Sequence, residues 1–313
     1  MRLMRAALAP VLSLVLLGAV ASASGASTKA AVRPHKLPTI VIGNEGFTES
    51  YIMQDIYADL LKHAGYSVSL LPQASSSRTE EIPALEKGSV DLVPDYAGSL
   101  LVYLNSKDEK QAGTLSTAIS TANSILNKKG VTELAGTAGL DQNVFVVTDA
   151  TKAKYKLTTI ASVKPYASKF VFGAPPECST YYFCLPGLKA VYGLDKGSAK
   201  FKQVKSLDES GPLSVTALKD GTAQIVELFS TDDVISADHF YVLQDNLNLE
   251  PADHLVPVIR TSDATTAVKK ILASVNPYLT TSVLTQLVAA PSGPSHPTPA
   301  AVAAGFLAQE KLT

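Results

Sequence analysis

A segment of the sequence returns in a similar form 133 positions later. The first copy runs from Ala84 to Tyr96 and the second from Ala217 to Phe229. Each copy has the pattern of a helix end, a glycine that stops the helix, a short apolar strand and a final aromatic residue. Chance similarity between common residue types is the alternative explanation. The repeat indicates that the chain folds as two α/β halves of similar construction.

The start of each half supports this division. The apolar strand 40–43 and the apolar strand 170–173 both end in glycine. In open α/β sheets, ligands bind beyond the carboxyl ends of the strands. Because both halves place an aromatic residue at the end of the repeated strand, we expect a cleft between two lobes that closes over a small molecule.

Apolar periodicity and turn residues predict the order of the elements. Strands are expected over residues 40–43, 66–71, 90–93, 143–148, 169–173, 200–205, 223–228, 240–243 and 255–260. Helices are expected over residues 48–64, 96–104, 111–129, 185–192, 212–219, 264–275, 281–290 and 300–311, with a further helix ending at residue 87. The strands 143–148 and 255–260 should cross between the lobes as a hinge. The predicted fold is a two-lobe α/β fold, with residues 39–145 plus 256–313 in lobe 1 and residues 146–255 in lobe 2.

Residues 1–26 are predicted to form a secretory signal peptide. Arg2 and Arg5 precede an apolar stretch, and small residues follow at two potential cleavage sites. The apolar stretch is shorter than the ~20 residues that span a membrane, and an uncleaved N-terminal anchor is the alternative. No cysteine lies near the cleavage sites. We therefore expect an exported protein, in the periplasm or on the exterior of the cell envelope, that is not a lipoprotein.

Composition excludes one class of partner. The chain has 313 residues, of which 46% are hydrophobic, and this is enough for two ordinary domains with cores of their own. The formal net charge is −1. The sequence therefore lacks the basic balance typical of proteins that bind nucleic acid.

The two cysteines, Cys178 and Cys184, are predicted to form a disulfide. A single C-x5-C pair lacks the other two ligands of a structural zinc site. In an oxidising compartment such a pair is typically bonded, although two free buried thiols are the alternative. The bond would hold Tyr181 and Tyr182 in a short loop.

No catalytic or cofactor motif is found in the sequence. The patterns G-x-S-x-G, H-E-x-x-H, G-x-x-x-x-G-K-[ST] and G-x-G-x-x-G are absent. The five histidines stand at unrelated spacings. The carboxylates Asp95, Asp232 and Asp233 are better explained as turn formers and helix caps. We therefore expect neither an enzyme nor a bound cofactor or metal.

Aromatic residues form the candidate binding site. They follow strands, lie on the crossing strand or lie in the cysteine loop, where a lobe exposes residues to the cleft: Phe47, Tyr96, Phe145, Tyr181, Tyr182 and Phe229. Aromatic faces attract cations, and cages of such rings hold quaternary ammonium groups. With no tryptophan in the chain, tyrosine and phenylalanine must form any cage. Aromatic residues of the core are the alternative.

Several motifs give the chain a family resemblance that extends from Thr39 to Leu312. They are G-x-x-x-F-T-E at 43–49, S-R at 77–78, P-A-L-E-x-G-x-x-D-L-x-P-x-Y-x-G at 83–98, the P-P-E-C to C-L-P-G-L block at 175–188, and S-T-D at 230–232. The chain resembles the substrate-binding proteins of ABC importers for osmoprotectants (glycine betaine, carnitine, choline). This resemblance implies a type II periplasmic-binding-protein fold and separate permease and ATPase partners.

The resemblance also assigns roles to residues of the site. It implies that Tyr96, Phe145 and Phe229 are walls of a cage around a trimethylammonium group. Thr48 and Ser99 would make polar contacts. The ligand-binding set expected here is completed by Phe47, Arg78, Tyr181, Tyr182 and Thr231.

The chain departs from the pattern of betaine-binding proteins in ways that weaken carboxylate binding. Phe145 and Phe229 replace tyrosines, Glu45 replaces a lysine, and Tyr181 stands near the expected arginine. Because a buried carboxylate without a partner is costly, glycine betaine fits this site less well. Arg78 is the remaining candidate cation, with a salt bridge at a helix entry as its alternative role.

We therefore expect a monomeric receptor for a small cationic or zwitterionic solute. A receptor for another solute in the same cleft, such as an amino acid or an aromatic compound, is the first alternative. A secreted enzyme on the same scaffold is the second, and the absence of a nucleophile–base motif argues against it.

Overall fold

The computed structural model describes residues 39–313 except 74–75, 106–113, 209 and 252. The predicted signal segment, residues 1–26, and the start of the helix expected over residues 111–129 lie outside the described residues.

The first sheet has the strand order β2-β1-β3-β10-β4. Its strands are β1 (Thr39–Ile42), β2 (Ser67–Leu70), β3 (Leu92–Tyr96), β4 (Val131–Glu133) and β10 (Leu255–Arg260). β1 runs parallel to β2 and β3, whereas β10 runs antiparallel to β3 and β4. The sheet is therefore mixed, and its one antiparallel insertion, β10, comes from the far end of the sequence.

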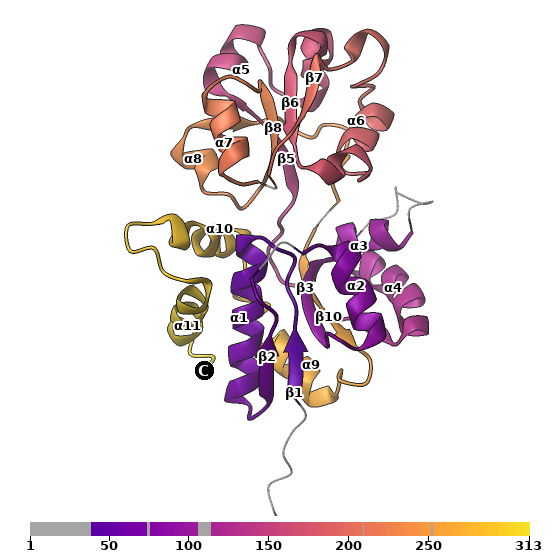
Figure 1. The fold of residues 1–313 in the computed structure, drawn as a ribbon, viewed down its shortest axis with the longest axis vertical. Coiled ribbons are helices and arrows are strands. Elements are labelled where there is room, and N and C mark those ends of the chain that lie inside the picture. The colour runs from indigo at the N-terminus through magenta and orange to yellow at the C-terminus, as the bar shows by residue number, and fades with distance from the viewer. Residues whose placement is uncertain (1–38, 74–75, 106–113, 209, 252) are drawn as a thin grey trace, which may run out of the picture. The chain divides into compact units, whose positions relative to one another are not determined.

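Helices cover both faces of the first sheet (Figure 1). They are α1 (Thr48–His63), α2 (Arg78–Lys87), α3 (Ala97–Leu104), α4 (Leu115–Leu126), α9 (Thr266–Ala273), α10 (Thr281–Ala289) and α11 (Pro299–Gln309), with the short 3-10 helices η1 (Asn127–Lys129) and η5 (Ala290–Ser292). On one face, α1 packs with α9, α10 and α11 in one apolar cluster. On the other face, α2, α3 and α4 form a second cluster. Lobe 1 is thus a three-layer unit with a core on each side of its sheet.

The second sheet has the strand order β7-β6-β8-β5-β9. Its strands are β5 (Asn143–Thr148), β6 (Val171–Ala174), β7 (Gln203–Ser206), β8 (Ile225–Phe229) and β9 (Phe240–Val242). Its helices are α5 (Asp149–Tyr155), α6 (Leu185–Val191), α7 (Pro212–Lys219) and α8 (Val234–Ala237), with the 3-10 helices η2 (Ile160–Lys169), η3 (Pro176–Ser179) and η4 (Gly197–Ala199). Two apolar clusters, again one on each side, form the core of lobe 2.

The two sheets confirm the internal repeat. In the second sheet β6, β7 and β8 take the places that β1, β2 and β3 have in the first, so β3 and β8 are equivalent central strands. A glycine in the left-handed region follows the helix before each of them, with φ +77° at Gly88, directly after α2, and +69° at Gly221, after the cap Asp220 of α7. A side chain is strained in that conformation, which explains why both copies carry glycine.

The strands at the crossings belong entirely to one sheet each. β5 pairs only with β8 and β9, and β10 pairs only with β3 and β4. The connections between the sheets are therefore residues 134–142 and, among the described residues, 243–251 and 253–254, which form isolated bridges but no helix or strand. β5 begins at Asn143, three residues before the predicted start of lobe 2 at residue 146, and β10 begins at Leu255, one residue before the predicted return to lobe 1 at residue 256.

Local sequence explains the helices that position the cavity. In α1, Ile52, Ile56 and Leu60 recur every four residues and are buried against the sheet. Gly65, with φ +91°, follows the end of the helix. In the described part of the chain, no helix combines the length and apolar character that crossing a membrane requires.

Candidate functional site

A cavity of about 670 Å³ opens where both central strands end. This volume lies in the range of small-molecule sites. Its lining residues come from both lobes: Glu45, Phe47, Ser76, Ser77, Arg78, Thr79, Tyr96, Ser99, Val102, Tyr103, Asp141, Gln142, Asn143, Pro175, Pro176, Glu177, Cys178, Thr180, Tyr181, Tyr182, Leu207, Asp208, Glu227, Phe229 and Asp253. The cavity therefore lies at the carboxyl ends of the strands, where the repeat predicts a ligand site.

Three aromatic rings gather at this cavity. Phe47 immediately precedes α1, Tyr96 ends β3 and Phe229 ends β8. The Phe47 ring lies roughly parallel to the Tyr96 ring, at 27° with centroids 6.1 Å apart. It lies 5.3 Å from the Phe229 ring, tilted by 50°. The equivalent strands of the two lobes thus each supply one ring, and Phe47 joins them.

The cysteine loop contributes the other predicted aromatic residues. Cys178 and Cys184 are bonded, which confirms the predicted disulfide. Tyr181 and Tyr182 both line the cavity. The Tyr181 hydroxyl donates a hydrogen bond of 2.6 Å to Ser99 Oγ, at the start of α3. The loop of lobe 2 is therefore tied directly to lobe 1 beside the cavity.

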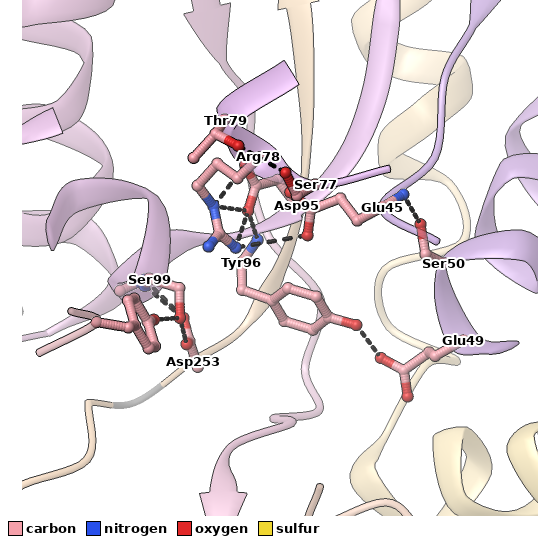
Figure 2. A network of polar contacts seen from close by, with 12 residues as sticks. Glu45, Glu49, Ser50, Ser77, Arg78, Thr79, Asp95, Tyr96, Ser99 and Asp253 are labelled. Atoms are coloured by element: carbon pink, nitrogen blue, oxygen red, sulfur yellow. Dashed lines mark hydrogen bonds and ion pairs between the residues drawn. The ribbon is translucent and has the colours of Figure 1, made fainter. Parts of the chain in front are cut away.

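Arg78 lines the cavity, but its charge is already matched. Its Nε and Nη2 atoms donate to Asp95 Oδ1 at 2.9 and 2.6 Å, and Nη2 lies 3.5 Å from Glu45 Oε2. Asp95 is fully buried. Arg78 is the first residue of α2, and Figure 2 shows its guanidinium joined to both carboxylates by dashed lines. This geometry favours the alternative role considered for Arg78, a salt bridge at a helix entry, over a free cation for a ligand.

Acidic side chains dominate the charge of the lining. They are Glu45, Asp141, Glu177, Asp208, Glu227 and Asp253, and among the described lining residues Arg78 is the one basic side chain. Burial raises the pKa of Asp253 to about 6, while hydrogen bonds from Ser99 lower it. Burial also raises the pKa of Asp141 well above its usual value. A concave site lined by charges of one sign concentrates ligands of the opposite sign, so the lining would attract cations where these carboxyls are ionised.

Asp253 has a structural role at the same place. Its Oδ1 accepts hydrogen bonds from the backbone N–H groups of Gly98 and Ser99 at 2.7 and 3.0 Å. Its Oδ2 accepts a hydrogen bond from Ser99 Oγ (Figure 2). The second crossing segment is thereby fixed to the N-terminus of α3, where a carboxylate satisfies free N–H groups and the helix dipole.

Three predicted site residues lie outside the cavity lining. Phe145 is 1% exposed and packs against Phe172, with ring centroids 6.0 Å apart, in the core of lobe 2. Thr48 is the first residue of α1. Thr231 is 1% exposed, and its backbone N–H donates to Asp141 Oδ1 at 3.1 Å. The structure therefore brings together Phe47, Arg78, Tyr96, Ser99, Tyr181, Tyr182 and Phe229, and it places Phe145 in the core.

Comparison with known proteins identifies the family to which the chain belongs. Residues 38–309 match the family model OpuAC, described as the substrate binding domain of ABC-type glycine betaine transport systems. The chain belongs to this family. Its members are extracytoplasmic solute-binding proteins of transporters, so the predicted resemblance is confirmed.

The individual proteins compared with this chain share little sequence identity with it. A glycine-betaine-binding protein of Pseudomonas aeruginosa is 27% identical over 237 residues, which cover 71% of each chain. A crystal structure of a glycine betaine/carnitine/choline ABC transporter has a TM-score of 0.67 at 20% identity and covers 87% of this chain and 99% of its own. Lactococcal OpuAC, closed on glycine betaine, has a TM-score of 0.63 at 14% identity, with 88% and 96% covered. These structures confirm the two-lobe fold of the family.

Sequence reasoning missed several acidic residues of the site. Asp253 and Asp141 lie in the crossing segments, far in sequence from the groups they contact, and no local pattern marks them. Glu49 is different, because it is the last residue of the F-T-E motif at 47–49. The motif contributed only to the family resemblance. The position of this glutamate in the first turn of a helix that begins at the cavity could have identified it as a residue of the site.

Proposed function

We propose that this chain is the solute receptor of an ABC importer and that its cavity binds a small cation with a quaternary ammonium group. The observation that supports this most is the pairing of three converging rings with an acidic lining. Aromatic faces attract cations that have no N–H group to donate. Phe47, Tyr96 and Phe229 would be the walls that contact the ammonium group.

Within this class, the cavity favours a cation without a carboxylate. Choline carries one positive charge, whereas glycine betaine adds a carboxylate that needs a counter-charge when it is buried. Arg78 already bonds Asp95 and Glu45. The family resemblance implies that Glu45 replaces a lysine of betaine-binding proteins and that Tyr181 stands near their expected arginine. We therefore infer that choline-like cations bind more tightly than glycine betaine.

The same proposal covers the partners. A receptor of this family delivers its solute to a permease that an ATPase drives, and we expect both to be separate proteins. We expect the mature protein to act as an exported monomer that is not a lipoprotein, because residues 1–26 have the pattern of a cleavable signal and no cysteine lies near the cleavage sites.

Calorimetric titration with three ligands tests the proposal. Choline is compared with glycine betaine and with 3,3-dimethylbutanol, a neutral molecule in which carbon replaces the nitrogen of choline. We expect choline to bind at least about tenfold more tightly than either, which corresponds to ~1.4 kcal/mol. Tighter binding of glycine betaine would overturn the choice of ligand. Equal binding of the neutral molecule would overturn the cation site itself.

A further inference from the structure

Glu49 lies directly behind one wall of the aromatic site. It is the second residue of α1 and is 3% exposed. The Tyr96 hydroxyl donates a hydrogen bond of 2.6 Å to Glu49 Oε1. Figure 2 shows the Tyr96 ring reaching toward this carboxylate, away from Arg78. Within the described residues, Glu49 Oε2 has no hydrogen-bond partner at bonding distance.

The surroundings of Glu49 offer no compensating positive charge in the described part of the chain. Asp141, from the first crossing, and Asp232, after β8, are the carboxylates that act on it, and Glu45 acts on Tyr96. Of the elements packed against α1, β2, α10 and α11 contain no ionisable side chain, and Asp95 on β3 is bonded to Arg78. α9 carries Lys269 and Lys270, which are both exposed. A negative charge on Glu49 is therefore balanced by hydrogen bonds alone.

This position makes the ionisation of Glu49 sensitive to pH near pH 7. Burial raises the pKa of Glu49 to about 7, the hydrogen bond from Tyr96 and the nearby Thr231 side chain lower it, and the charge of Asp232 raises it. Thr231 belongs to lobe 2, so the carboxylate senses both lobes. A cation brought to the opposite side of the Tyr96 ring would stabilise the ionised form.

Resting on the quaternary ammonium site proposed above, we propose that Glu49 is a positioning residue that links cation binding to the release of a proton. The ionised carboxylate accepts the Tyr96 hydroxyl, fixes the ring and makes it a stronger partner for a cation. It also adds a negative charge behind the ring. When Glu49 is protonated, the charge is lost and the hydrogen bond from Tyr96 is weaker, because a neutral carboxyl is a poorer acceptor. Binding of the cation therefore drives the proton from Glu49 to solvent.

The sign of the effect follows from linkage. The bound state favours the carboxylate, so its pKa is lower in the complex than in the free protein. Affinity is then full above the free-state pKa of about 7 and falls as the pH drops through that value. The steepest dependence for one proton is tenfold in affinity per pH unit.

Titration with tetramethylammonium and with choline between pH 5.5 and 8.5 tests this proposal. In the unmodified protein, affinity should rise with pH and level off above about pH 7. Calorimetry in two buffers of different ionisation enthalpy should show proton release below pH 7. In Glu49→Gln, which cannot ionise, affinity should be lower and its pH dependence weaker. Tyr96→Phe keeps the ring but removes the hydroxyl, and it should weaken the pH dependence in the same way.

Glu133→Gln is the matched control. Glu133 is also a buried glutamate, 2% exposed, but it does not line the cavity. This substitution should leave both affinity and pH dependence unchanged. A pH dependence that persists in both Glu49→Gln and Tyr96→Phe would assign the proton to another carboxylate and overturn the proposal. Affinity that is independent of pH in the unmodified protein would also overturn it while leaving the cation site intact. Failure to bind either probe at any pH would instead reject the cation site on which it rests.

Discussion

Phe145 and Phe229 look equivalent in the sequence but have different surroundings in the fold. Both lie on strands of sheet two, and both stand where betaine-binding relatives are expected to carry tyrosine. Phe145 lies on β5 and is enclosed by the core of lobe 2, whereas Phe229 is the last residue of β8 and faces the cavity. The position of an aromatic residue at the end of a strand therefore indicates a binding role better than the residue type alone does.

Truncation of the two rings should separate these roles. We expect Phe145→Ala to lower the free energy of unfolding by ~3–5 kcal/mol, because it leaves a cavity in the core. Phe229→Ala should change stability less and weaken choline binding about tenfold, since a desolvated cation–π contact contributes up to ~2 kcal/mol. Urea denaturation and calorimetric titration of both variants provide the two measurements. Normal choline affinity in Phe229→Ala would remove this ring from the site.

Glu133 should make stability depend on pH. Burial raises its pKa to about 9, and Asp95 and Asp253 add to this effect. Because the folded-state pKa lies above the ordinary value of 4.5, the folded protein binds the proton more tightly than the unfolded chain. The resulting stabilisation is complete below about pH 4.5 and is lost as the pH rises toward 9.

Glu133→Gln keeps the shape of the side chain and cannot titrate. The unmodified protein should therefore lose stability relative to this variant between pH 5 and 8.5, as measured by urea denaturation at several pH values. A constant difference between the two proteins over this range would show that Glu133 is ionised in the fold.

At the scale of elements, periodicity predicted most helices and strands because their apolar faces are local in sequence. β3 was predicted to end at residue 93, although it extends to Tyr96. The cause is Pro94, which normally argues against a central strand. In the fold, Pro94 lies opposite Pro257 on β10, beyond the point where β1 pairs with β3 at Ile42 and Leu92. No sequence pattern shows that two prolines will face each other across a sheet.

The cavity was predictable in part for the same reason. The repeat identified Tyr96 and Phe229, and Phe47 was identified because it follows the first strand. The contacts of Asp253 with α3 and of Asp141 with Thr231 join residues far apart in the chain. Such contacts depend on how the crossings are placed, and local sequence does not encode that placement.

The loop closed by the disulfide should affect both the stability of lobe 2 and the binding of the ligand. Replacing both Cys178 and Cys184 by serine should lower the free energy of unfolding by only about 2 kcal/mol, because the closed loop is short. Choline affinity should fall as well, since the loop presents Tyr181 and Tyr182 to the cavity. Tyr181→Phe, which keeps the loop and removes the bond to Ser99, is the matched control.

Thiol labelling of the unfolded, unreduced protein should detect no free cysteine, and two reactive thiols would contradict the bonded pair.

At the scale of the whole molecule, the two crossings determine how the lobes can move. The described residues of these crossings form no helix or strand, whereas the strands that follow them are fixed within one sheet each. Such segments can absorb a rotation without breaking a strand ladder. We expect choline to close the lobes and to reduce the radius of gyration in small-angle scattering. An unchanged radius at saturation, proved by calorimetry, would count against closure.

The position of β10 has a consequence for how the chain reaches this fold. Lobe 2 is formed by one continuous stretch of chain, but sheet one stays divided until β10 enters between β3 and β4. Until residues 255–313 are made, β3 and β4 leave open strand edges, which are sites of aggregation. Sheet two should therefore gain protection first in pulsed hydrogen exchange during refolding. Chains that stop before Leu255 should carry a finished lobe beside an unfinished one, and this would make them natural targets for quality-control proteases.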